Sequence, residues 1–114
     1  MPSVRKTYIV RGNDRDFEVR ISKDKQPVDL RDVDIFCEIK DAPNGNLLFE
    51  AIVMRTEAES QNGIFRVRFP KERTIGLTVG KKVFFDFRFV FPDGTEKNFP
   101  VPPIEAMVVD RVTD

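Results

Sequence analysis

Histidine and tryptophan are absent from the 114-residue sequence, and cysteine occurs once, at Cys37. Without histidine, the chain lacks the side chain that most often serves as a general base or a metal ligand. A single cysteine excludes an internal disulfide and a zinc site built from several thiolates. The 19 basic residues equal the 19 acidic ones, and zero net charge argues against binding nucleic acid or a membrane surface by bulk attraction.

Long hydrophobic runs are also missing. The apolar stretches are a few residues long, too short for a membrane span, and the first residues lack the apolar segment of a signal peptide. We therefore expect synthesis in a cytoplasm and no membrane partner. The length predicts one domain, residues 1–114, and a hydrophobic content of 40% fits a self-sufficient core.

Apolar and charged residues alternate in most segments between turns. The clearest case is residues 82–91, where one face carries an apolar side chain at every second position and the other face carries charges. Segments 17–21, 35–40 and 65–69 show the same period of two. Such alternation is typical of antiparallel strands with one face on a core and one toward water.

Turn residues divide the chain into eight predicted strands, at about 6–11, 16–22, 34–40, 46–57, 63–69, 82–91, 95–99 and 104–110. Asn44-Gly45 suits a two-residue hairpin turn, although Asp41-Ala42-Pro43 could widen it. Pro92-Asp93-Gly94-Thr95 should form a second hairpin, with Gly94 in the left-handed conformation. At most one short helical turn is expected, near residues 71–75, because Gly76 ends it too soon for a longer helix.

This pattern predicts an all-β fold. Two packed antiparallel sheets of about seven or eight strands in total would bury the apolar faces, so we expect an immunoglobulin-like β-sandwich. The disulfide and tryptophan of antibody domains are missing. A small closed barrel is the alternative.

No residue is assigned to catalysis, a cofactor or a metal. Cys37 lies among inward-facing apolar residues and is expected to act as a small buried hydrophobe. Asp29, Asp32 and Asp34 could hold calcium, but their spacing differs from that of a calcium loop and Arg31 lies among them. A solvated turn with an Asp–Arg pair is the favoured interpretation.

Two binding functions receive weak support from the residues. Arg66 and Arg68 share a strand face that could contact nucleic acid, but a mixed-charge surface with cross-strand ion pairs is favoured. Sugar-binding sites usually stack tryptophan or tyrosine against the ring, and Tyr8 is the only such residue.

Phe36 and Phe84 depart from the alternating pattern. Each lies on the charged face of its strand, and Val53, Val90, Met107 and Val109 could do the same, depending on register. Clustered exposed apolar residues mark contact surfaces, so Phe36 and Phe84 are candidate protein–protein interface residues. The alternative is that a loop or the terminal segment covers them.

Seven segments, taken in order, resemble the small all-β N-terminal domain of phage baseplate upper proteins and related short phage tail proteins. They are Tyr8–Asn13, Phe17–Ile21, Pro27–Leu30, Asp34–Lys40, Asn62–Val67, Gly80–Phe87 and Pro92–Thr95. The pattern spans nearly the whole chain. The chain departs from the family in its short length and in the density of phenylalanine at residues 82–91.

The resemblance implies a non-enzymatic structural protein of a phage or prophage, made in the bacterial cytoplasm and located in the tail or baseplate of the virion. Other tail or baseplate subunits are its expected partners, and homo-oligomers such as rings or collars are expected assemblies. No catalytic residue or cofactor carries over. The alternative function is a carbohydrate-binding or adhesin-type module.

Overall fold

The computed structural model describes residues 7–111, with the backbone alone at residues 101–102. Strands account for 53% of the structure and helices for 9%, which confirms the expected β class. The five-stranded sheet contains, in spatial order, β1 (Thr7–Val10), β10 (Glu96–Val109), β9 (Lys82–Val90), β5 (Asp34–Lys40) and β6 (Leu47–Glu50). The three-stranded sheet contains β2 (Arg15–Arg20), β8 (Ile64–Phe69) and β7 (Ile52–Met54). A short hairpin contains β3 (Ser22–Lys23) and β4 (Gln26–Pro27).

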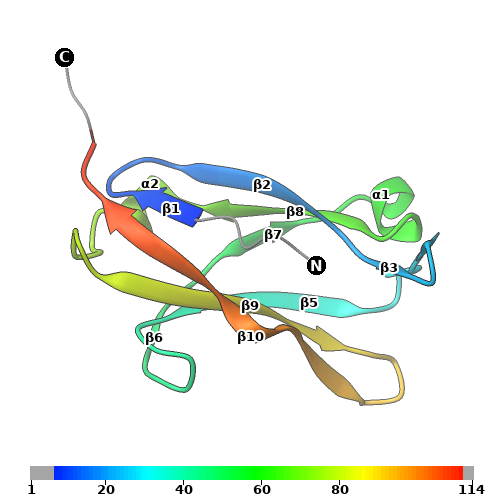
Figure 1. Ribbon diagram of the computed structural model, residues 1–114. Helices are drawn as coiled ribbons and strands as arrows, with labels where there is room; N and C mark the ends of the chain where they lie inside the picture. The colour runs from blue at the N-terminus through cyan, green and yellow to red at the C-terminus, as the bar shows by residue number, and fades with distance from the viewer. Residues whose placement is uncertain (1–6, 112–114) are drawn as a thin grey trace.

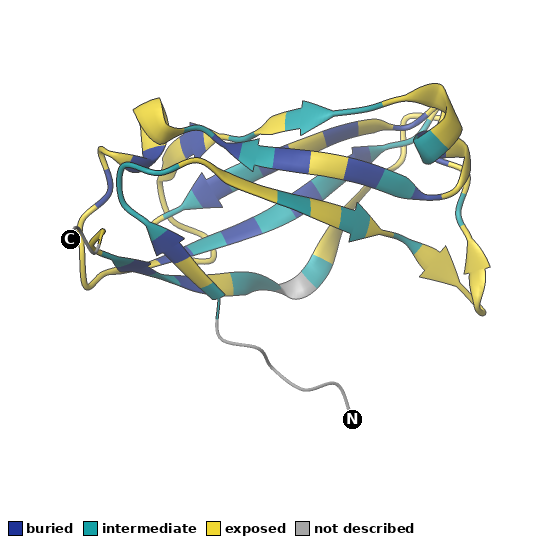
Figure 2. Cartoon of the chain, turned by 90° about the horizontal axis from the view of Figure 1, so that it is seen from above, coloured by how far each residue is buried: buried dark blue, intermediate teal, exposed yellow. Residues whose placement is uncertain are grey.

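The hydrophobic core lies between the five-stranded and three-stranded sheets, which form two facing layers (Figure 1). Phenylalanine rings meet across this interface edge to face, with 5.3 Å between the centroids of Phe65 and Phe87 and 5.1 Å between those of Phe69 and Phe85. Such edge-to-face pairs add to the stabilisation from burial. Buried and accessible residues alternate along the strands, as the sequence predicts (Figure 2).

The prediction of two sheets is wrong because the described part of the chain forms three. The third is the β3–β4 hairpin, where only a polar turn is expected from the sequence. Asp24 and Lys25 both adopt positive φ there, at 53° and 66°. Neither residue is glycine or asparagine, so the usual sequence signal for a tight hairpin turn is missing.

The predicted strand at 46–57 is also wrong, because the chain changes sheets at Ala51. The Ala51 amide donates to the Cys37 carbonyl at 2.9 Å, while β6 pairs with β5 and β7 pairs with β8. The two strands predicted at 95–99 and 104–110 are instead one strand, β10, whose pairing with β9 shifts in register between Phe99 and Ile104.

Two further expectations need correction. Among the strands of residues 7–111, pairing is antiparallel except between β1 and β10, which run parallel. Within residues 7–111, two short helices form rather than one: α2 (Lys71–Thr74) at the expected place and α1 (Glu57–Gln61). Thr56 caps α1 by accepting a hydrogen bond from the Glu59 amide at 3.2 Å, which is the capping pattern of Thr-x-x-Glu.

The two predicted turns have different outcomes. The connection after β5 is a wider loop over residues 41–46, in which the Asn46 amide donates to Asp41 Oδ1 at 2.8 Å. Asp41-Ala42-Pro43 therefore does widen the Asn44-Gly45 turn. Gly94 has a φ of 88°, as predicted for the hairpin between β9 and β10.

Candidate functional site

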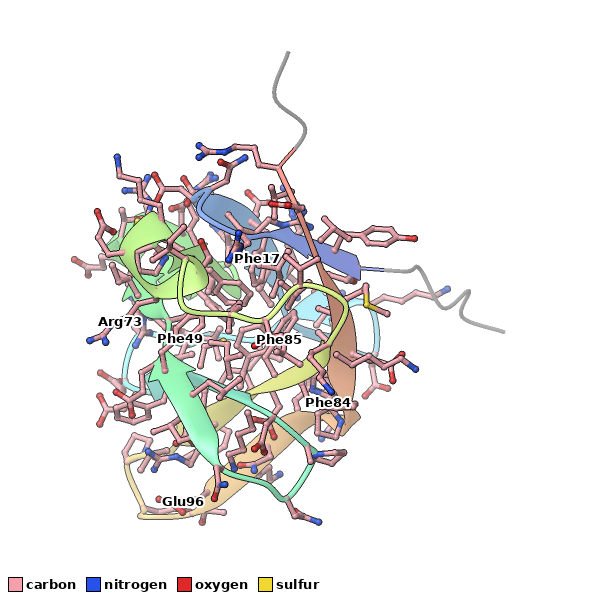
Figure 3. All side chains as sticks on the ribbon, turned by 90° about the vertical axis from the view of Figure 1, so that its left-hand side faces the viewer. Phe17, Phe49, Arg73, Phe84, Phe85 and Glu96 are labelled. Atoms are coloured by element: carbon pink, nitrogen blue, oxygen red, sulfur yellow. The ribbon has the colours of Figure 1, made fainter. Side chains whose placement is uncertain are left out.

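Phe36 and Phe84 both lie on the side of the five-stranded sheet that faces away from the core, here called the outer face. Phe36 on β5 is 37% exposed, and the Arg88 guanidinium carbon lies 4.4 Å from the centroid of its ring. Phe84 on β9 is half-buried, on the opposite side of the strand from the core residue Phe85 (Figure 3). Arg88 is the register partner of Phe36, whereas Phe84 pairs with Lys40. The two rings are thus separated by four residues, or about 13 Å along the strands, and do not form one cluster.

Three carboxylates lie in line across the outer face, between the levels of Phe36 and Phe84. Asp86 on β9 is the register partner of Glu38 on β5, and Glu38 is in turn the partner of Glu50 on β6. We call these three residues the acidic row. Directly opposed like charges destabilise a sheet, because their side chains lie only about 5 Å apart.

The acidic row is only partly neutralised. Arg88 Nε lies 3.9 Å from Glu38, but no ion pair involves Asp86 or Glu50 among residues 7–111. Partial burial is the main cause that raises the pKa of the Asp86 carboxyl; the positive charge of Lys40 acts in the opposite direction, and the charge of Glu38 raises the pKa by a smaller amount. The ionised form of Asp86 is therefore less favourable in the folded protein than in water.

Apolar side chains flank the acidic row on both sides. On one side, Leu47, which is 50% exposed, and Phe84 are the two register partners of Lys40. On the other side lies Phe36, stacked with Arg88. The outer face thus combines a line of negative charge with apolar contacts at its margins.

The described part of the outer face is acidic although the whole chain is neutral. Six carboxylates and three cations point outward from its strands, which gives a net charge of −3. They are Asp34, Glu38, Glu50, Asp86, Glu96 and Glu105, and Lys40, Lys82 and Arg88.

The outward side of the three-stranded sheet differs from the outer face because its charges are matched. Arg68 binds Asp16 through two hydrogen bonds of 2.8 Å, and Arg66 contacts Glu18 at 3.3 Å and Glu59 at 2.9 Å. The hydrogen bonds from Arg68 hold the pKa of the Asp16 carboxyl below its usual value. The interpretation of Arg66 and Arg68 as members of cross-strand ion pairs is therefore confirmed.

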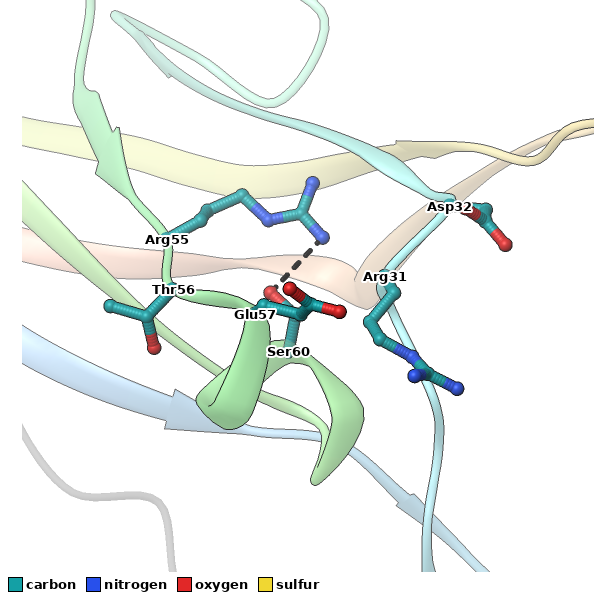
Figure 4. A pocket seen from close by; sticks show the side chains of 6 residues that line it. All are labelled: Arg31, Asp32, Arg55, Thr56, Glu57 and Ser60. Atoms are coloured by element: carbon teal, nitrogen blue, oxygen red, sulfur yellow. Dashed lines mark hydrogen bonds between the residues drawn. The ribbon is translucent and has the colours of Figure 1, made fainter.

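The hollow beside α1 lies around Arg55, whose side chain has a structural role (Figure 4). Its guanidinium donates hydrogen bonds to the carbonyls of Leu30 and Val33 and lies 3.4 Å from Ser60 Oγ. These bonds connect β7 to the loop that precedes β5. The Arg55 charge is therefore engaged by backbone carbonyls rather than directed toward a ligand.

Two other candidates from the sequence have structural roles. Arg31 forms the predicted pair with Asp29, at 2.7 Å, within the Asp29–Asp34 segment. Cys37 is buried, as predicted, and burial raises the pKa of its thiol far above the ordinary value, with a smaller contribution from Asp86 and Glu38. The thiol is therefore protonated and poorly placed to act as a nucleophile.

Sequence reasoning missed Glu50, Leu47 and the alignment of the acidic row. The alternating pattern shows that Glu38 and Asp86 point outward, but it does not show which residues of distant strands become neighbours. Sequence reasoning also missed Phe99, which is 53% exposed although it is the register partner of the buried Phe87.

A scan of the sequence against known family models and a search of curated proteins both find no match. Among residues 7–111, no helix has the length and apolar character needed to cross a membrane.

Proposed function

We propose that this chain is a non-enzymatic interaction protein of a phage or prophage tail or baseplate, and that it binds another subunit through its outer face. The proposal for the particle rests on the seven segments that resemble baseplate and tail proteins. The proposal for the surface rests on the geometry of the outer face.

We further propose that the fold is an immunoglobulin-like β-sandwich. The order β10–β9–β5–β6 corresponds to strands G, F, C and C′ of a variable-type domain, and β2–β8–β7 corresponds to strands B, E and D. The sheet change at Ala51 lies between the strands that correspond to C′ and D. This correspondence supports the proposal even though the sequence lacks the disulfide and the tryptophan of antibody domains.

The acidic row is the observation that carries the proposed contact surface. Opposed carboxylates cost stability, and residues that conflict with the stability of their surroundings are expected at functional sites. Asp86 and Glu50 form no ion pair among the described residues, so a bound partner can supply a cation for each. Phe36, Phe84 and Leu47 would then pack around the charged contacts and exclude water.

The charge of the outer face specifies the chemistry of its partner. Two copies of this face would bring two net charges of −3 together, which disfavours face-to-face self-association. A partner that presents lysine or arginine between apolar side chains would match both the acidic row and its margins. Salt should weaken such a complex, because the unpaired carboxylates are accessible to solvent.

The proposal can be tested by affinity capture from lysates of cells that encode this chain. The tagged wild-type protein is compared with a Phe36→Ser/Phe84→Ser variant, and with an Ile52→Ser/Ile75→Ser control that removes two exposed apolar side chains outside the outer face. Circular dichroism establishes that all three proteins are folded.

We expect the wild-type and control proteins to recover the same virion subunit, and the outer-face variant to recover roughly tenfold less, because interface aromatic residues often dominate affinity. Equal recovery by the outer-face variant would exclude this surface. Failure of the wild-type protein to recover any virion subunit would contradict the assignment to a phage particle.

A further inference from the structure

A groove runs along the side of the molecule where β10 and β2 approach each other. It consists of two hollows of about 610 and 340 Å³ that share Phe99 and Arg20 in their walls. The larger hollow lies between the β3–β4 hairpin and the β9–β10 hairpin, which project from the same end of the molecule (Figure 1). This groove is separate from the outer face.

The floor of the larger hollow is apolar. Phe89 and Phe91 line it from the β9 side, and Val28 and Leu30 line it from the chain that follows β4. Phe99 is more than half exposed at its edge. An exposed phenyl ring beside an apolar floor provides a place for a hydrophobic side chain of a ligand.

The rim of the larger hollow is basic. Arg20, Lys23 and Lys97 line it, and no aspartate or glutamate does. Arg20 is paired with Glu18 at 2.7 Å, but Lys23 and Lys97 have no ion pair among the described residues. Lys97 Nζ lies 5.8 Å from the centroid of the Phe91 ring, which places its charge over the apolar floor. The larger hollow therefore complements a ligand that is apolar and negatively charged.

The edge of β10 beside the groove is open. β1 pairs only with Ala106–Val109, so the segment Glu96–Phe99 has β9 on one side and, within residues 7–111, no strand on the other. Its outward backbone amides and carbonyls can pair with an added strand. Lys97 and Phe99 lie on the same side of β10, as register partners of the inward-facing Phe89 and Phe87, and line the larger hollow together with Asn98.

We propose that this groove binds an extended, acidic segment of a partner protein, which adds to the open edge of β10 as a further strand. Apolar side chains of the segment pack against Phe99 and Phe91, and its carboxylates lie beside Lys97 and Lys23. The open edge favours a peptide over a fatty acid, because only a peptide can satisfy the free amides and carbonyls. This inference goes beyond the proposed function, since it concerns a different surface and a partner of opposite charge.

The direct test is a titration of the ¹⁵N-labelled protein with the capped peptide TLTETETLT, followed by NMR. The peptide reads the same in both directions, so parallel and antiparallel addition present the same side chains. The matched control peptide is TLTKTKTLT. We expect the acidic peptide to shift the amide signals of residues 96–99 and 20–23, and to slow amide hydrogen exchange in Glu96–Phe99 through new backbone hydrogen bonds.

Charge-reversed variants link binding to the groove. Lys23→Glu/Lys97→Glu should reduce the affinity for the acidic peptide by about tenfold or more, because both substitutions turn attraction into repulsion. Lys71→Glu/Lys81→Glu is the matched control, because it makes the same change in net charge at two exposed sites outside the groove. The Phe36→Ser/Phe84→Ser variant should bind the peptide normally, which keeps this test independent of the outer face.

Three results would overturn the inference: no spectral change at millimolar acidic peptide, equal binding of the lysine peptide, or binding without slower exchange in Glu96–Phe99. If dodecanoate shifts the groove signals and the acidic peptide does not, the groove is a site for an amphipathic small molecule instead, and the strand-addition proposal is wrong.

Discussion

The substitution Asp86→Asn should stabilise the protein at neutral pH. Asp86 directly opposes Glu38, and partial burial raises the pKa of its carboxyl. Asparagine has nearly the same shape and removes the charge. The substitution therefore removes the cost of partly burying a charge and the repulsion from Glu38, which together outweigh the lost attraction of Lys40, while it preserves the packing of β9 against β5.

The expected gain in stability can be worked out from the register of the acidic row. Opposed like charges cost about 0.2–1 kcal/mol, and solvent exposure places Asp86 in the lower half of that range. We expect the free energy of unfolding to rise by about 0.5 kcal/mol, which corresponds to about 2 °C in Tm for a chain of this length.

The stability difference between Asp86→Asn and the wild-type protein should depend on pH. Because the pKa of Asp86 is raised in the folded state, the destabilisation from its charge is complete above that pKa. It disappears as the pH falls through the raised value and toward the ordinary value of 3.8. The advantage of Asp86→Asn over the wild-type protein should therefore vanish in acid.

Urea unfolding followed by circular dichroism, in steps from neutral pH to about pH 3, measures this difference. Asp16→Asn is the matched control, because hydrogen bonds from Arg68 lower the pKa of Asp16. That variant should be less stable than the wild-type protein at neutral pH, and its deficit should shrink as the pH falls through the lowered pKa. A loss of stability for Asp86→Asn at neutral pH would refute the reasoning about the acidic row.

Three further predictions concern the core and the turns. Phe87→Ala should reduce the free energy of unfolding by about 3–5 kcal/mol in urea titrations, because it removes a buried ring that contacts Phe65 across the sheets. Gly63→Ala should lower Tm far more than Gly94→Ala: both have positive φ, but an added Cβ at Gly63 would lie 2.4 Å from the Ile21 carbonyl, and at Gly94 it would meet nothing within 4 Å. Cys37 should react with a thiol reagent only after denaturation, and rapid labelling of the native protein would show that the core is open.

The sequence predicts the strands with strict alternation well. β9 and β5 carry a phenylalanine, isoleucine, valine or cysteine at each inward position, and their burial follows the pattern residue by residue. Gly94 also behaves as predicted, because its position in a Pro-Asp-Gly-Thr turn requires a left-handed residue. These features depend on neighbours in the sequence, so a local pattern is sufficient to find them.

The features that depend on distant segments were not predictable in this way. Ala51 separates two strands because β6, before it, pairs with β5, whereas β7, after it, pairs with β8. The acidic row exists because β9, β5 and β6 pair in one particular register, which no alternating pattern can specify. α1 had a local signal in Thr56 and Glu59, but the expectation of a long strand at 46–57 concealed it.

The two proposed surfaces carry opposite charges and would bind different partners. The outer face carries excess carboxylates between apolar margins, and the groove beside β10 carries unpaired lysines above an apolar floor. A protein that joins two different subunits would use both surfaces at once. The neutral overall charge of the chain is consistent with this division.

The most direct measurement for the outer face compares stability and partner recovery in the variant Glu38→Gln/Glu50→Gln/Asp86→Asn, which neutralises the acidic row. We predict that this variant unfolds at a higher temperature than the wild-type protein and recovers less of its partner subunit at low salt, since the charges that cost stability are those that attract the partner. Unchanged recovery by a folded variant would contradict the account, because the acidic row would then have no role in binding.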